Sequence, residues 1–182
     1  MSAAELSEAI QNTEFFTAMR ESMLVYPIVL SCHLASIAIF GGMILMTDLR
    51  LLGVAMKSMS ITDVVRQTRI WKGIGLVVSV TCGILLAGSK FASYYDNPYF
   101  QIKMTLLALV GVHAILFRKS VYHNTEELDR LPKIPRVAKV AACASMILWV
   151  GILSAGRWIA YFERPTPTAS INAAQIISAS AR

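Results

Sequence analysis

Two histidines stand inside apolar stretches of the sequence, where an imidazole group needs a hydrogen-bond partner or a metal ion. His33 lies in the uncharged stretch 24–46, and His113 lies in a later apolar stretch. Counted from Leu24 and Ile102, each is roughly 14–16 Å deep if the chain is helical. A haem iron takes one imidazole on each face of its ring, so it needs two at equal depth on different helices. The spacing therefore predicts a non-covalent haem b with His33 and His113 as its metal ligands.

Other residues of suitable type extend this predicted cofactor site. Cations near the ends of three helices can pair with haem propionates, and these are Lys90, Lys103 and Arg157. Gly41 and Gly83 would leave room for the macrocycle, and the Trp149 indole ring could pack on its edge. We predict that these six residues surround the two histidines.

A structural interpretation of the same residues remains open. Each histidine can instead hydrogen-bond Ser, Thr or a carbonyl group of a neighbouring helix, and a cation at a helix end can be an interfacial anchor. Asp48 and Arg50 form the acid–base pair beside the first apolar stretch. We expect this pair to orient the helix end, with binding of a quinone or a lipid headgroup as the alternative. His123 falls in a charged loop, where we expect it to be exposed.

The composition places the chain in a membrane. Its 182 residues allow one domain; 55% are hydrophobic and only 15% are charged, with a mean hydropathy of +0.57. We predict an all-α integral membrane four-helix bundle within 24–162, with spans at about 24–46, 70–91, 99–118 and 137–162. An amphipathic segment, 1–23, precedes it as an interfacial helix or a polar tail, and a polar tail, 163–182, follows it.

The distribution of Lys and Arg predicts the orientation. Eleven of the 17 cationic residues fall in or beside the first and third connections between the predicted spans. The positive-inside rule assigns those connections to the cytoplasm and both termini to the outside of a bacterial inner membrane. The net charge of +6 therefore reflects topology. No basic stripe with interleaved aromatic residues indicates nucleic-acid binding.

Several classes of chemistry are excluded by missing motifs. The sequence has no H-E-x-x-H, no G-x-S-x-G and no phosphate-binding loop, so hydrolytic chemistry is not indicated. The cysteines, Cys32, Cys82 and Cys143, fall in separate apolar segments without a C-x-x-C motif, which favours buried free thiols. Small residues recur at every fourth position of the second span, at Gly75, Ser79, Gly83 and Ala87. Such a face admits a close helix backbone or a flat ligand.

The segment H-L-A-S-I-A-I-F-G-G-M-I-L-M-T-D-L-R-L-L-G, from 33 to 53, resembles an uncharacterised family of small four-span bacterial membrane proteins with a D-L-R-L-L-G signature. The resemblance extends through K-M-T-L-L-A-L and L-W-V-G-I-L-S-A-G-R-W-I-A-Y. A fainter resemblance is to the haem-binding membrane protoporphyrinogen oxidases, and the positions that carry it are His33, Gly41, Gly42, Arg50, Lys103 and His113. That resemblance implies a haem ligand at His33 and a group needed at the porphyrin site at Lys103.

From these patterns we expect a membrane haem b protein that passes electrons. We expect it to be a small subunit of a larger membrane complex with other membrane or periplasmic redox subunits, with quinone as a further ligand to consider. Two alternatives remain: a protoporphyrinogen-oxidase-like haem enzyme, and a cofactor-free structural or accessory subunit.

Overall fold

The computed structural model describes residues 3–117, 121 and 125–162, and these residues form helices without a strand. Four helices are apolar and long enough to cross a membrane: α3 (Val25–Leu52), α4 (Ile61–Ser89), α6 (Pro98–Phe117) and α8 (Arg136–Ile159). Many large apolar side chains of these helices are exposed, for example those of Ile84, Ile115 and Ile147. In a bilayer such side chains face lipid. The predicted all-α, four-span architecture is confirmed.

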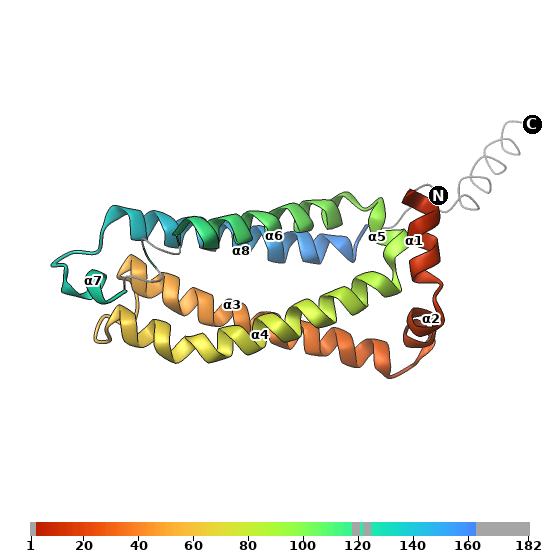
Figure 1. The fold of residues 1–182 in the computed structure, drawn as a ribbon, viewed down its shortest axis with the longest axis horizontal. Coiled ribbons are helices and arrows are strands. Elements are labelled where there is room, and N and C mark those ends of the chain that lie inside the picture. The colour runs from red at the N-terminus through yellow and green to blue at the C-terminus, as the bar shows by residue number, and fades with distance from the viewer. Residues whose placement is uncertain (1–2, 118–120, 122–124, 163–182) are drawn as a thin grey trace, which may run out of the picture.

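The long helices form two antiparallel pairs (Figure 1). Helix α3 packs on α4, α6 packs on α8, and α8 also contacts α3, which joins the pairs. Short helices lie at both ends: α1 (Ala3–Gln11), α2 (Glu14–Glu21) and α5 (Phe91–Tyr95) at one, α7 (Thr125–Arg130) at the other. We call these the α2 end and the α7 end. Helices α3 and α6 run from the α2 end to the α7 end, and α4 and α8 return.

The N-terminal segment forms two helices instead of one, and both pack across the α2 end. The Arg20 guanidinium group of α2 donates hydrogen bonds to the carbonyl oxygens of Ser89, at 3.0 Å, and of Gln11, at 3.3 Å. The first bond satisfies a carbonyl group at the C-terminus of α4, where a positive charge also complements the helix dipole. The Phe16 ring fills the space beside Gly88, where a Cβ atom would clash with it.

Two helix boundaries at the α7 end differ from the prediction. Helix α3 continues to Leu52 and ends at Gly53, whose φ of +74° is accessible to glycine at little cost. Helix α4 begins at Ile61 instead of near 70, because its N-terminus is capped. The expected loop is therefore largely helical, and Lys72, which stands near the start of the predicted span 70–91, lies well inside α4.

Helices α3 and α4 lie close together at Gly75 and Phe40. A Cβ atom on Gly75 would lie 3.0 Å from the Cβ atom of Phe40, 3.1 Å from its nitrogen and 3.2 Å from its Cα. Gly75 therefore admits the neighbouring backbone, as the small-residue pattern predicted. Farther along α4, Gly83 instead faces a side chain: a Cβ atom there would lie 3.1 Å from the His33 ring.

Replacing Gly75 with alanine tests this crossing, because the backbone of Phe40 has less freedom to move aside than a side chain has. The matched control is Gly73→Ala in the same helix, where an added Cβ atom has no neighbour within 4 Å. Both variants gain helix propensity of about 1 kcal/mol. We expect Gly75→Ala to be about 1–3 kcal/mol less stable than Gly73→Ala, as overpacked sites are, in denaturant unfolding in detergent. Equal stabilities would contradict the crossing.

A carboxylate from α7 caps the N-terminus of α4. Asp129 accepts hydrogen bonds from the backbone N–H groups of Ile61, at 2.7 Å, and Thr62, at 3.0 Å. Partial burial of Asp129 opposes its ionised form, but these two hydrogen bonds and the nearby Arg50 lower the pKa of its carboxyl group. Near this cap, an apolar cluster fills the α7 end, and it comprises Leu51, Ile61, Val121, Leu128, Ala138, Ala141 and Ala142.

We expect Asp129→Ala to lower the free energy of unfolding by about 0.5–2 kcal/mol at neutral pH, as loss of an N-cap does. The pKa of the folded state lies below the unfolded value of about 3.9, so the stabilisation is complete above that value. It is lost as the pH falls through the folded pKa. Unfolding measured against pH should show the two proteins converging in acid, with the exposed Glu127→Ala as control. A difference that is independent of pH would argue against the charged cap.

Candidate functional site

His33 lies in the half of the bundle nearer the α2 end and is half-buried between α3 and α4. Its Nδ1 atom is 2.9 Å from the carbonyl oxygen of Ser79. Because a carbonyl group only accepts, Nδ1 carries the hydrogen and donates it. In the neutral ring, Nε2 then keeps its lone pair. Histidine metal ligands commonly hold their second nitrogen in this way, by donating it to a carbonyl oxygen.

Lys103 of α6 shares this level of the bundle. It is close enough to His33 for the two groups to interact electrostatically, and its Nζ atom lies 3.7 Å from where a Cβ atom on Gly156 would be. Among the described residues, Lys103 has no hydrogen bond or ion pair. An amine without a partner next to an imidazole group can bind a carboxylate of a ligand.

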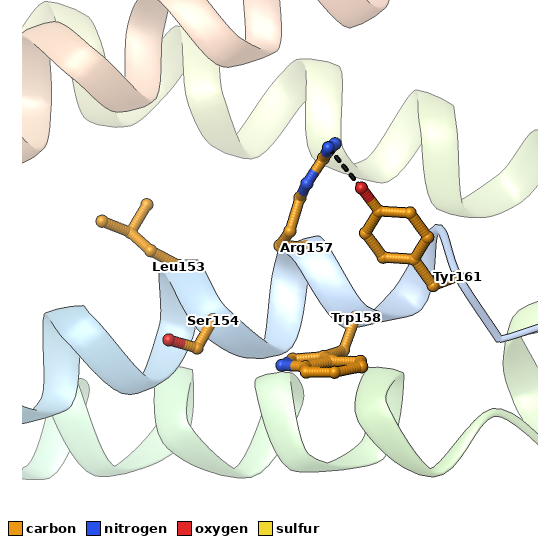
Figure 2. Close-up of a pocket in the computed structure, with 5 residues that line it drawn as sticks. All are labelled: Leu153, Ser154, Arg157, Trp158 and Tyr161. Carbon is orange, nitrogen blue, oxygen red and sulfur yellow. Dashed lines mark hydrogen bonds between the residues drawn. The ribbon is translucent and has the colours of Figure 1, made fainter.

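Arg157 lies next to Gly156 on α8, at the same level. Its guanidinium group donates a hydrogen bond to the Tyr161 hydroxyl group, and Figure 2 shows Arg157 and Trp158 on opposite sides of α8. An open groove of about 690 Å³ runs here along the end of α8, lined by Leu153, Ser154, Arg157, Trp158 and Tyr161. Neither His33 nor Lys103 lines this groove.

Lys90 lies at the α2 end, between α4 and α5. Its Nζ atom is 4.9 Å from the centre of the Tyr26 ring, a cation–π contact. Burial, with the neighbouring Tyr26, raises the pKa of Tyr94 to about 12, so this phenol stays neutral. Lys90 is thus part of an aromatic group at this end, and its contact is with a ring instead of a carboxylate.

Trp149 and Gly41 contact each other in the middle of the bundle. The indole ring lies 3.8 Å from where a Cβ atom on Gly41 would be, and it packs edge-on against Phe40 at 5.3 Å between ring centres. Gly41 therefore makes room for the indole ring. Gly42 and Gly111 have no atom within 4 Å of an added Cβ, so they do not mark a tight contact.

The predicted equal depth of His33 and His113 is wrong. His113 donates from Nε2 to the carbonyl oxygen of Ala141, at 2.9 Å. Gly41 and Trp149 mark one level, and His33 lies eight residues from it toward the α2 end. Ala141 lies eight residues from it toward the α7 end. At 1.5 Å per residue the two rings are roughly 24 Å apart along the bundle, whereas a bond from a histidine nitrogen to a metal ion is about 2 Å long. The two histidines do not converge on one metal site in this structure.

The sequence-predicted pair of Asp48 and Arg50 is also separated. Arg50 donates from Nε to the carbonyl oxygen of Met59, at 2.7 Å. Asp48 is buried in the bundle and interacts electrostatically with Lys72. The predicted span 70–91 put Lys72 near the membrane surface, so it was not paired with Asp48. The signal available was the Ser60–Asp63 capping pattern, which starts α4 early.

The remaining predictions concern the cysteines, His123 and the C-terminal tail. Cys32, Cys82 and Cys143 are free thiols, as predicted, but their predicted burial is wrong, because Cys32 and Cys143 are exposed on the helix bundle and Cys82 is half-buried. His123 and the tail 163–182 lie outside the described residues. Within residues 3–117, 121 and 125–162, no three His, Cys, Asp or Glu side chains gather as a metal site. This finding does not bear on the predicted haem, because a haem contains its own iron and needs only one or two protein ligands.

Comparison with known proteins identifies a family. A family model described as "Family of unknown function (DUF6644)" matches residues 13–162. Neither the curated proteins nor the solved structures gave a match. The family match confirms the resemblance to an uncharacterised family, and it bears on neither the D-L-R-L-L-G signature nor the likeness to the haem oxidases.

Proposed function

Because the chain belongs to this family of unknown function (DUF6644), we propose its activity from the site alone. We propose a multi-pass membrane haem b protein that passes electrons, as a small subunit of a membrane redox complex. The site would be the level shared by His33, Lys103 and Arg157. This differs from the arrangement expected from the sequence, since His113 is no longer a ligand.

The observation that carries the proposal is the orientation of the His33 ring. Its Nδ1–H group is held by Ser79, which leaves Nε2 to bind an iron atom. A Cβ atom on Gly83 would lie 3.1 Å from the Cε1 atom of the ring, so the glycine leaves room for the ring at this position. A bound haem b would supply a one-electron redox couple.

The cations at the same level would hold the carboxylates of such a cofactor. Lys103 has no other polar partner among the described residues, and Arg157 can form two parallel hydrogen bonds with one carboxylate. Both would lower the cost of placing negative charge near hydrocarbon. The proximity of Lys103 to His33 also suits the oxidase alternative, in which the same pocket would act on a porphyrinogen.

A cofactor-free structural subunit is a second candidate with its own support. Each histidine is hydrogen-bonded to a carbonyl oxygen of the neighbouring helix, at 2.9 Å. Interhelical bonds of this kind stabilise membrane bundles without a ligand, by about 0.6–2 kcal/mol each. This function needs neither the free Nε2 atom of His33 nor the unpaired Lys103 amine.

The absorption spectrum of the purified protein separates these functions. We expect a Soret band that shifts on reduction with dithionite, because an iron ligated by His33 would change its electron count. His33→Ala should abolish the band, and Lys103→Met should weaken haem retention. His113→Ala is the matched control, since it removes an interhelical histidine at the α7 end, and it should keep the spectrum.

Two results would contradict the proposal: a colourless preparation after expression with added haem, or equal loss of haem from His33→Ala and His113→Ala. The first would favour the structural subunit, and the second would restore the ligand pair expected from the sequence. Oxidation of a porphyrinogen by the haem-loaded protein would replace electron transfer with the oxidase activity.

A further inference from the structure

A second polar layer lies near the α7 end, apart from His33. Its side chains come from three helices and are buried at 6% exposure or less: Thr47 and Asp48 of α3, Thr68 of α4 and Ser145 of α8. Asp48 is 1% exposed. Few carboxyl groups are this deeply buried in proteins, and in membrane spans ionisable residues are commonly functional.

The carboxylate of Asp48 has no satisfying partner in this layer. Neither of its oxygen atoms accepts a hydrogen bond from any described residue. The Ser145 hydroxyl group approaches it without forming a well-aligned bond. Lys72 acts on it electrostatically, but the Nζ atom of Lys72 donates to the Thr47 hydroxyl oxygen at 3.2 Å instead of forming an ion pair with Asp48. A buried ionised carboxylate in this state is strongly unfavourable.

The neighbouring groups limit what the carboxylate can bind. A metal cation would meet the ammonium group of Lys72, which already brings a positive charge to this layer. A proton removes the charge of the carboxylate and requires no added volume. The resulting carboxyl O–H group can donate to Ser145, whose hydroxyl oxygen also accepts.

We propose that Asp48 is a proton-binding site in the half of the membrane nearer the α7 end. The carboxyl group is protonated at rest and exchanges its proton, through Lys72, with water at that end of the bundle; α3 itself ends at Leu52, one helical turn beyond Asp48. When the proton binds, an O–H bond forms on the carboxylate as an N–H bond of the Lys72 ammonium group breaks. The Lys72 amine then regains a proton from water, so one proton is taken up in total.

All four long helices place polar or charged groups at this end of the bundle. Helix α4 contributes Lys72, and α8 contributes the uncharged Ser145. From α6, His113 lies at this end, bound to Ala141 one turn along α8 from Ser145. Arg50 of α3 is directed to the carbonyl oxygen of Met59. Lys72 is therefore the direct exchange partner, and this inference is independent of the haem site.

Infrared spectroscopy of the full chain in liposomes tests the proposal. At neutral pH we expect the C=O stretching band of a carboxylic acid, which shifts to lower frequency in D₂O because the proton exchanges. Asp48→Asn should remove the band, and Glu127→Gln, an exposed acid on α7, should leave it unchanged. Absence of the band from the wild-type protein, absence of the D₂O shift, or survival of the band in Asp48→Asn would each overturn the proposal.

A second variant keeps the test decisive if Asp48→Asn does not fold. In Lys72→Met the cation that favours the ionised carboxylate is gone. The carboxylic-acid band should then persist to higher pH than in the wild-type protein. An unchanged pH for the loss of the band would show that Lys72 is not the exchange partner and would overturn the mechanism.

Discussion

The close approach of α3 to α4 at Phe40 and Gly75 is the constraint on which the rest of the bundle depends. A glycine there allows backbone-to-backbone contact, and interdigitated helices cannot slide past each other without losing it. The same part of α3 receives the Trp149 ring beside Gly41, which sets the position of α8 as well. Because α6 packs on α8, one crossing determines the level of every polar side chain in the four long helices.

The consequence is a bundle with two polar layers separated by an apolar one. His33 and Lys103 lie toward the α2 end, whereas Asp48 and Lys72 lie toward the α7 end. The Phe40 and Trp149 rings fill the space between. Charges in hydrocarbon interact strongly over short distances, so this separation lets the two layers hold different charge states. The proposed redox site and the proposed proton site would therefore not share a layer of the bundle.

The sequence predicted the four spans well, because each is a long apolar stretch whose composition alone requires a bilayer. It placed the residues within them less well. The start of α4 is marked locally by the Ser60–Asp63 pattern, but its second cap, Asp129, lies 68 residues away from Ile61, and no local pattern reveals that one. Depth was counted from the edges of apolar stretches, but α6 begins at Pro98 and α3 extends to Leu52. Counting His113 from Ile102 instead of Pro98 accounts for roughly 6 Å of the separation from His33, and the rest reflects how the helices are staggered, which the apolar stretches alone do not reveal.

The two histidines also show why residue type alone does not define a site. Both donate a hydrogen bond to a carbonyl oxygen of a neighbouring helix, but from different ring nitrogens. His33 keeps Nε2, which points away from its own backbone and can approach a flat macrocycle. His113 keeps Nδ1, which lies beside the carbon that joins the ring to the chain and is more hindered. Their neighbours differ as well, since His33 lies near an amine and His113 lies 4.8 Å from the Phe117 ring. The same bond is therefore compatible with ligand binding at one end and favours helix packing at the other.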